Sequence, residues 1–259
     1  MSRLRAKCPD CRTYTAVALG PEYQCHSCGR EFRAGLVRVA GAWGRGGESM
    51  VETARSLPLP FPEAAVVAED SLGEQTLAVA SELPERPLVL GGCCCSHVGA
   101  VEALAARHGR LALIWVDAHG DLNTPETSPS GNAWGMPFRM LLDSGAVAPD
   151  DVALVGARNL DPPEEEFIAA SGLHTGAGSV ERALQGAGCV YVALDVDSLD
   201  ADEVVPFMPE PGGLSVDEVE GLFASVARDA TVLGAGITAA LPDRRNVEPL
   251  VRLCRALGL

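Results

Sequence analysis

The chain has 259 residues, of which 47% are hydrophobic and 21% are charged, and its formal net charge is −15. This composition is that of a globular protein with a packed core, and it excludes a disordered chain. The sequence has no apolar stretch of the roughly 18 residues that a membrane span requires, and residues 1–8 lack the apolar segment of a secretory signal. We therefore expect a cytoplasmic protein without a membrane partner.

Four of the nine cysteines form two Cys-x-x-Cys pairs, Cys8 with Cys11 and Cys25 with Cys28. Two such pairs supply four thiolates, which is enough to close the tetrahedral shell of one zinc ion. Because a closed shell leaves no open position, this zinc would be structural and would fold a module too short to build its own core. The alternative is four free surface thiols, which requires this arrangement to arise by chance.

Charge separates the N-terminal segment from the rest of the chain. The first 40 residues hold 7 Lys and Arg against 3 Asp and Glu and so carry +4, whereas the remaining residues carry −19. We predict a zinc ribbon over residues 1–35 and a larger domain over residues 36–259. A body of this charge repels phosphate, so we expect no nucleic-acid partner. The ribbon is instead expected to dock on the acidic body or on a protein partner, and the sequence leaves a homo-oligomer open.

The larger domain alternates short apolar runs with helical patterns. The runs are continuous rather than alternating in hydrophobicity, which is typical of buried parallel strands. The predicted strands are residues 87–90, 111–116, 151–156, 190–194 and 231–234, and the predicted helices include residues 98–108 and 215–228. The second helix opens with the capping-box pattern of Ser215 and Glu218. This order predicts an α/β fold of three layers, with the ligand site at the carboxyl ends of the parallel strands.

Metal-binding residue types follow two of these strands directly. They are Asp117, His119 and Asp121 after the strand at 111–116, and Asp195 and Asp197 after the strand at 190–194. If the two strands are neighbours, four carboxylates and one imidazole converge, and their repulsion requires cations between them. Two divalent ions that share carboxylates would meet this requirement, and Mn²⁺ suits such oxygen-rich ligands best. The alternative is that these aspartates only cap helices and turns.

The residues around these clusters resemble the arginase and agmatinase (ureohydrolase) family. Residues 117–132 are similar to the family segment DAHxDxNTPxTxxSGN without a gap. Residues 193–200 resemble the motif SxDVDxLDP, and residues 91–92 and 209–214 also match the family pattern. The resemblance covers residues 36–259 and leaves the zinc ribbon outside. It implies an arginase-like three-layer fold and a hydrolase that acts on linear amidines.

The resemblance also implies the ligands of two manganese ions. These candidate ligands are Cys94, Asp117, His119, Asp121, Asp195 and Asp197. Asp117 and Asp195 would bridge the ions, and the solvent between them would be a hydroxide near neutral pH that can attack an amidinium carbon. Among the ligands, His119 and Asp121 are also the expected catalytic residues.

Five further residues match positions at which arginases hold an amino acid substrate. They are Asn123, Ser130 and Asn132 for the α-carboxylate, and Asp161 and Glu164 for the α-ammonium. The match favours a small-molecule guanidino amino acid over agmatine, which has no carboxylate. The alternative is an ordinary polar loop.

The chain departs from the family pattern in the ligand that precedes the first predicted helix. Residues 91–95 read Gly-Gly-Cys-Cys-Cys where arginases read Gly-Gly-Asp-His-Ser, so Cys94 replaces a histidine ligand. A thiolate is softer than an imidazole, so one site could take zinc or iron in place of manganese. His97 could substitute as the ligand, but we favour Cys94 and expect His97 to be an ordinary helix residue.

Two further departures concern the reaction. Trp134 replaces a family histidine proposed to shuttle protons, and Ala239 replaces the glutamate that binds the guanidinium. A missing general acid or base costs about 10²–10⁴ in rate, so L-arginine is expected to be a poor substrate. Nω-hydroxy-L-arginine has a less basic guanidino group, so its rate of hydrolysis would fall less from these two replacements. The branch of the family that hydrolyses it also uses a cysteine ligand and lacks the shuttle histidine.

We therefore predict a divergent ureohydrolase that converts Nω-hydroxy-L-arginine to ornithine and hydroxyurea. It would use two manganese ions and carry one structural zinc. Two alternatives are a catalytically silent protein that binds a guanidino amino acid and a scaffold directed by the ribbon.

Overall fold

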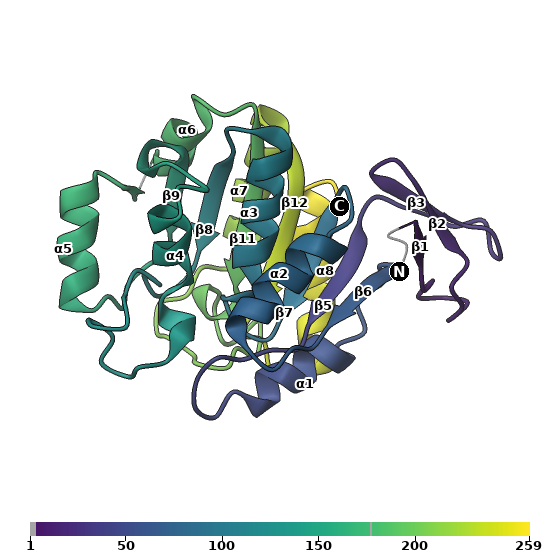
Figure 1. Cartoon of the computed structure of the whole chain (residues 1–259), viewed down its shortest axis with the longest axis horizontal. Coiled ribbons are helices and arrows are strands. Elements are labelled where there is room, and N and C mark those ends of the chain that lie inside the picture. The colour runs from purple at the N-terminus through teal and green to yellow at the C-terminus, as the bar shows by residue number, and fades with distance from the viewer. Residues whose placement is uncertain (1–3, 177) are drawn as a thin grey trace.

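The computed structural model of the chain describes residues 4–176 and 178–259. It contains a small antiparallel sheet near the N-terminus and a large sheet whose eight strands pair in parallel (Figure 1). Within these residues, no helix has both the length and the apolar character that crossing a membrane would require.

The large sheet has the strand order β10-β9-β8-β11-β12-β7-β5-β6. Its strands are β5 (Gly35–Val39), β6 (Glu63–Val67), β7 (Pro87–Gly91), β8 (Ala112–Val116), β9 (Val152–Val155), β10 (His174–Thr175), β11 (Cys189–Asp195) and β12 (Thr231–Thr238). The predicted strands β7, β8, β9 and β11 are confirmed, with ends that shift by a residue or two.

β12 is longer than predicted, because it continues through two glycines to Thr238. The predicted strand ended at Gly234. In the structure, a Cβ at Gly234 would lie 2.7 Å from the carbonyl oxygen of Pro87, and a Cβ at Gly236 would lie 2.5 Å from the hydroxyl of Tyr191. Both glycines therefore permit close packing inside the strand, and neither ends it.

Helices cover both faces of the large sheet. They are α1 (Glu48–Ser56), α2 (Leu72–Glu82), α3 (Ser96–His108), α4 (Pro137–Asp143), α5 (Pro162–Ser171), α6 (Ser179–Leu184), α7 (Val216–Asp229) and α8 (Val247–Ala256). Leu113 and Trp115 of β8 point into the core beneath α2, α3 and α4, whereas Ile114 and Val116 point into the core beneath α7 and α8. The predicted three-layer α/β fold is confirmed.

The predicted capping box at the start of α7 is also present. Ser215 accepts a hydrogen bond from the backbone N–H of Glu218, and the Glu218 carboxylate accepts one from the backbone N–H of Ser215. The two bonds satisfy N–H groups that have no partner within the first turn.

The N-terminal segment folds as a separate sheet beside β6 (Figure 1). Its strands are β1 (Arg5–Ala6), β2 (Ala16–Leu19), β3 (Glu22–Cys25) and β4 (Glu31–Phe32). It contacts the body through two hydrogen bonds between the backbones of Lys7 and Glu63, at 2.8 and 2.9 Å. Tyr23 also packs so closely on Gly35 that a Cβ there would lie 2.8 Å from its ring. We propose a domain boundary after residue 35, which is the first residue of β5 and follows the small sheet closely.

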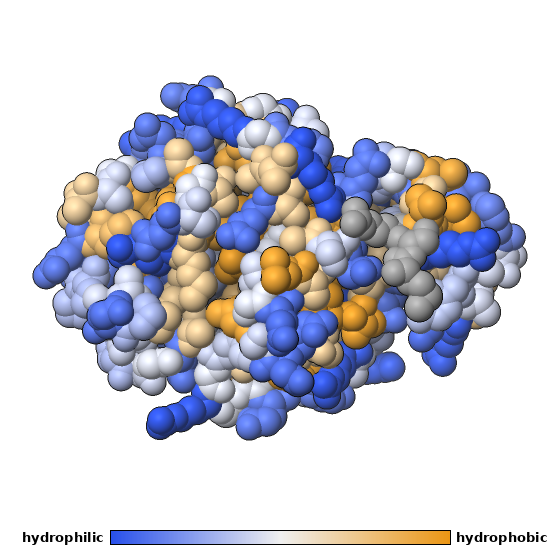
Figure 2. Space-filling model, in the orientation of Figure 1, coloured by the Kyte–Doolittle hydropathy of each residue, from blue (hydrophilic) through white to orange (hydrophobic). Residues whose placement is uncertain are grey.

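Hydrophilic residues cover much of the face shown in Figure 2, while hydrophobic residues gather over the region of α2 and β6 and on the N-terminal sheet. Among the residues that the structure describes, the large hydrophobic side chains that are exposed are those of Leu4, Tyr14, Leu19, Val66, Leu77 and Met208. Most of the large apolar side chains are buried in the two cores, which fix the strands that carry the site.

Candidate metal centre

The large sheet brings the two acidic clusters together. β8 pairs with β11 in parallel, and Val116 lies opposite Leu194. Asp117 follows Val116 and Asp195 follows Leu194, so both carboxylates leave the same edge of the sheet. The expectation that the two strands are neighbours is confirmed, and the clusters lie at the carboxyl ends of the strands.

One group of possible ligands consists of Asp117, His119 and Asp197, and one ligand atom from each lies within 4.8 Å of the others. Nδ1 of His119 is 3.5 Å from Oδ1 of Asp117 and 3.1 Å from Oδ2 of Asp197. The backbone N–H of His119 donates to Asp117 at 2.8 Å, and that of Ala118 donates to Asp197 at 3.2 Å. These backbone bonds hold both carboxylates in positions from which one ion could contact all three side chains.

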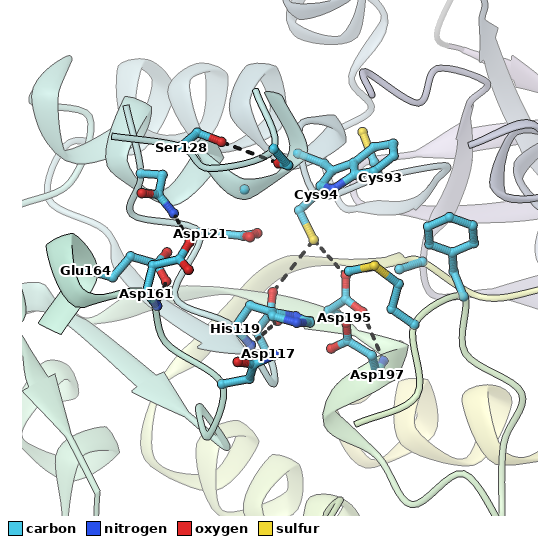
Figure 3. Close-up of a pocket in the computed structure, with 18 of the residues that line it drawn as sticks. Cys93, Cys94, Asp117, His119, Asp121, Ser128, Asp161, Glu164, Asp195 and Asp197 are labelled. Atoms are coloured by element: carbon cyan, nitrogen blue, oxygen red, sulfur yellow. Dashed lines mark hydrogen bonds and ion pairs between the residues drawn. The ribbon is translucent and has the colours of Figure 1, made fainter. Parts of the chain in front are cut away.

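A second group consists of Cys94, Asp117 and Asp121. Sγ of Cys94 is 3.8 Å from Oδ2 of Asp117 and 2.8 Å from Oδ2 of Asp195 (Figure 3). Asp121 has a φ of +53°, and its Oδ2 is buried without a hydrogen-bond partner. A buried carboxylate oxygen without a partner is costly, and a bound cation would satisfy it.

Electrostatics at the site also favour cations. Burial, and next the charge of Asp197, raise the pKa of Asp117 to about 6. Burial and neighbouring carboxylates raise the pKa of Asp121 and Asp195 well above the usual range, and burial with the charge of Asp195 does the same for the Cys94 thiol. The cluster cannot carry its full negative charge unless cations offset it. Its carboxylates, imidazole and thiol together fit two divalent ions.

His97 lies behind Cys94 and outside the residues that line the site cavity. Its side chain is fully buried, with Nδ1 at 3.1 Å from the hydroxyl of Tyr191 and Nε2 at 3.4 Å from Oγ1 of Thr238. Thr238 in turn lies 3.1 Å from Sγ of Cys94. Of the two alternatives left by the sequence, Cys94 is the one whose side chain reaches the cavity.

A cavity of about 160 Å³ adjoins the candidate ligands, and four of the five predicted substrate-binding residues line it, namely Asn123, Ser130, Asp161 and Glu164. Nδ2 of Asn123 donates to Oδ2 of Asp161 at 2.8 Å. Their polar groups lie in the same cavity as the acidic cluster. One small molecule could therefore contact both.

Two predicted substrate-binding residues, Glu164 and Asn132, accept hydrogen bonds from backbone N–H groups. Glu164 lines the cavity, but its carboxylate accepts from the backbone N–H groups of Leu122 and Asp161, both at 2.9 Å. It thereby completes the capping box of α5. Asn132 is outside the lining residues, and its Oδ1 accepts from the backbone N–H of Arg45 at 3.1 Å. Because of these bonds, Glu164 and Asn132 position the backbone around the cavity.

Several other cavity residues have no role predicted from the sequence, although Cys93 and Ser128 lie within segments that align with the family pattern. They are Met50, Cys93, Ser128, Asn159, Phe207 and Met208. Trp134 and Ala239, which mark departures from the family pattern, also line the cavity. The apolar members come from segments distant in sequence, so only the folded chain shows that they share one cavity.

Glu210 is a further residue that the sequence did not single out, although it lies in the matched segment 209–214. Its Oε1 accepts from Nδ2 of Asn159 at 2.9 Å and lies 3.5 Å from Nε2 of His119. Burial opposes a charge on His119, but its bonds to Asp117 and Asp197 outweigh this effect and raise its pKa to about 12. Carboxylates thus face both ring nitrogens and fix the orientation of the imidazole.

The four N-terminal cysteines converge in the small sheet. One Sγ atom from each of Cys8, Cys11, Cys25 and Cys28 lies within 4.8 Å of the others. Sγ of Cys8 is 3.9 Å from Sγ of Cys28, and Sγ of Cys25 is 3.9 Å from Sγ of Cys11. Four thiolates bound tetrahedrally at about 2.3 Å from one zinc ion would have closely similar separations.

Comparison with known proteins gives the same class of fold and site. The family model described as "Arginase family" matches residues 42–248. The arginase of Bacillus caldovelox is 31% identical over 206 residues, which cover 67% of this chain and 69% of that protein. The arginase of Staphylococcus aureus (strain COL) is 38% identical over 139 residues, 44% of this chain and 46% of the relative. The match thus spans about half the length of the Staphylococcus aureus relative and about two thirds of the Bacillus caldovelox relative.

The crystal structure of arginase from Bacillus cereus superposes with a TM-score of 0.72 at 24% identity, covering 86% of this chain and 96% of that one. This likeness shows the fold. The family match over residues 42–248 and the identity to the Bacillus caldovelox arginase show the family: the chain belongs to the arginase family. The N-terminal cysteine module lies outside the matched residues.

Proposed function

We propose that the protein is a metal-dependent amidinohydrolase that cleaves the guanidino group of an arginine-like amino acid. The favoured substrate is Nω-hydroxy-L-arginine, and the products are ornithine and hydroxyurea. The observation that carries this proposal is that the candidate metal ligands and the polar residues Asn123 and Asp161 line one cavity. The printed names of the relatives, which are arginases, support the reaction class.

The proposed ligands form two sets that share two aspartates. Cys94 and Asp121 join Asp117 and Asp195 in the first set, and His119 and Asp197 join the same two aspartates in the second. Two divalent cations bound there would lower the pKa of a water molecule bound to them to near 7, and they would polarise the guanidino group. Manganese is the proposed metal, and the softer thiolate of Cys94 could favour zinc or iron at the first site.

The side chains of the site hold the reacting groups. The carboxylate of Asp121, whose Oδ2 has no hydrogen-bond partner, could bind the first ion through one oxygen and accept a proton from attacking water through the other. His119 is fixed by Asp117, Asp197 and Glu210, so its imidazole keeps one orientation throughout the reaction. These contacts support a catalytic role for Asp121 and His119.

The opposite part of the cavity would bind the amino acid end of the substrate. Asp161 offers a carboxylate to the α-ammonium, while Asn123 and Ser130 offer polar groups to the α-carboxylate. We leave Asn132 and Glu164 out of this contact because their side chains are bound to backbone N–H groups.

A less basic guanidino group fits the remaining residues better than L-arginine does. Ala239 cannot pair with a cationic guanidinium, and Trp134 cannot carry a proton. A less cationic substrate loses less binding free energy from the change at Ala239. A substrate with a better leaving group loses less rate from the change at Trp134. The same two residues favour the second candidate function, a silent protein that binds a guanidino amino acid without cleaving it.

We also propose that Cys8, Cys11, Cys25 and Cys28 hold one structural zinc. Support comes from the separations of 3.9 Å between paired sulfur atoms. Thr15 reinforces the site, because its Oγ1 lies 3.2 Å from Sγ of Cys25.

The test of the proposed function is ornithine release from Nω-hydroxy-L-arginine and from L-arginine at matched manganese. The expected kcat/KM is about 10²-fold higher for the hydroxylated substrate. Asp195→Asn should abolish release, whereas Asp70→Asn, at an exposed position, should leave it unchanged. Equal or faster turnover of L-arginine would contradict Nω-hydroxy-L-arginine as the preferred substrate. Release of no ornithine from either compound would favour a protein that binds a guanidino amino acid without cleaving it.

A further inference from the structure

The site cavity has an apolar side formed by Met50, Trp134, Phe207, Met208 and Ala239, which we call the apolar wall. These five side chains contain no oxygen and carry no charge. The polar residues proposed to hold the amino acid end line the same cavity. Figure 3 shows Asp161 and Glu164 on one side of the aspartate cluster and Cys93 on the other.

Packing holds the apolar wall in place. Met50 and Ala239 belong to a buried cluster against which Trp134 and Phe207 pack. The rings of Trp134 and Phe207 meet edge to face, with centroids 5.9 Å apart. The Trp134 ring also lies against Gly44, where a Cβ would come within 2.3 Å of it. These contacts hold Met50, Trp134, Phe207 and Ala239 together, whereas Met208 adds an exposed side chain to the wall.

The apolar wall begins beside the candidate metal ligands. Ala239 directly follows Thr238, whose Oγ1 lies 3.1 Å from Sγ of Cys94 and 3.3 Å from Oδ2 of Asp195. The backbone carbonyl of Ala239 accepts from the N–H of Phe207 at 2.7 Å, which joins the segment after β12 to the loop that carries Phe207. A group that reacts at the cluster therefore lies next to the wall.

Burial against such a surface favours one kind of substituent. A charged or hydrogen-bonding group turned toward the wall would lose its bonds to water without a replacement. An apolar group would gain from leaving water, by about fourfold in affinity for each methylene buried. The wall thus distinguishes between guanidino compounds that share the same amino acid end.

We infer that the substrate is an N-substituted guanidino amino acid whose terminal nitrogen carries an apolar alkyl or aryl group, and that this group packs on the apolar wall. This inference rests on the proposed cleavage of a guanidino amino acid and departs from it in the substituent, because it places an apolar group where Nω-hydroxy-L-arginine carries a hydroxyl. In the reaction, the oxygen of one water bonds to the guanidino carbon. The bond from that carbon to the side-chain nitrogen breaks, and the two protons of the water go to the products, which are ornithine and an N-substituted urea.

The test is calorimetric binding of Nω-methyl-L-arginine and Nω-propyl-L-arginine to the manganese-loaded full chain. The propyl compound is expected to bind about 15-fold more tightly, since it adds two methylenes. Phe207→Ala and Met208→Gln should each remove most of this difference while retaining the affinity for the methyl compound. Both positions are on a loop and partly exposed, so these variants should fold. Leu77→Gln, at an exposed apolar residue of α2 outside the cavity, is the matched control and should keep the full difference.

Equal affinity for the two compounds, no binding of either, or an unchanged difference in both wall variants would overturn the inference. Release of ornithine from both compounds is measured separately. A preference for propyl without any ornithine would contradict the proposed hydrolysis and leave the apolar wall supported. Hydrolysis of Nω-hydroxy-L-arginine without a preference for the propyl compound would support the proposed hydrolysis and contradict the role of the apolar wall.

Discussion

Sγ of Cys94 lies 2.8 Å from Oδ2 of Asp195, although the two residues are 101 positions apart in the chain. Cys94 follows β7, Asp195 ends β11, and β12 lies between these two strands in the sheet. Thr238, at the end of β12, contacts both side chains. The ends of three parallel strands thus supply one side of the site, and a thiol occupies a position where the family pattern has an imidazole.

The identity of that ligand should set the metal preference. Cys94→His replaces a soft thiolate with an imidazole, so the variant should retain more manganese relative to zinc than the original protein. The measurement is metal content after dialysis against an equimolar mixture of the two ions. Cys189→Ser, at a half-buried cysteine outside the site, is the control. An unchanged ratio in Cys94→His would show that Cys94 does not contact the ion.

The N-terminal zinc should be independent of the active site. Cys11→Ser removes one of four thiolates and should lose about one equivalent of zinc. The small sheet should then become sensitive to proteolysis, while the body should keep its cooperative unfolding because its cores lie elsewhere. Zinc content that matches the original protein would rule out this site.

Stability of the metal-stripped protein should fall as pH rises from 5 to 8. The folded pKa of Asp117 is about 6, above its ordinary value of 3.8, so the folded state binds more protons in this window. The raised pKa of Asp121, Asp195 and His119 acts in the same direction. For Asp117 alone the loss between pH 5 and pH 8 amounts to about 1.4 kcal/mol, because the window covers about one pH unit below its folded pKa.

Thermal unfolding at a series of pH values measures this effect. Surface carboxylates whose pKa is lowered, such as Asp229 and Asp243, titrate below the window and do not obscure it. Added manganese should reverse the trend, since the cations bind the ionised carboxylates. A metal-stripped protein that is more stable at pH 8 than at pH 5 would contradict the raised pKa values.

Gly236→Ala should destabilise the fold by about 1–3 kcal/mol through overpacking. The new Cβ would lie 2.5 Å from the ring of His97 and from the hydroxyl of Tyr191. Gly221→Ala in α7 is the matched control, because nothing lies within 4 Å of its Cβ, and it should raise stability by about 1 kcal/mol. Chemical denaturation of both variants gives the comparison. Equal stability of the two would mean that His97 is free to move away.

Much of the fold could be predicted because apolar runs lead directly into the acidic clusters. β8 and β11 were identified from uninterrupted hydrophobic residues, and their ends placed Asp117 and Asp195 at one edge of a parallel sheet. The sequence does not predict where β12 ends, because glycines usually interrupt strands. In the fold, Gly236 is required inside β12, since His97 and Tyr191 fill the space that a side chain would need.

The site was predictable where residues are close in sequence and less so where the fold joins distant segments. The segment 117–132 predicts Asn132 as a substrate contact, and only the fold shows that its Oδ1 also accepts from the backbone N–H of Arg45, 87 positions away. The contact of Glu210 with His119 and the packing of Phe207 on Trp134 likewise depend on the fold. No spacing within the sequence indicates such pairs.

The most direct test of the two-metal centre is elemental analysis of the full chain after reconstitution with manganese and removal of unbound ions. The expected content is about three equivalents of metal, one in the N-terminal module and two at the aspartate cluster. Asp195→Ala should lose at least one of the latter two and unfold at a lower temperature, whereas Asp70→Ala should lose none. A single equivalent, lost only in Cys11→Ser, would contradict the two-metal centre and the hydrolase built on it.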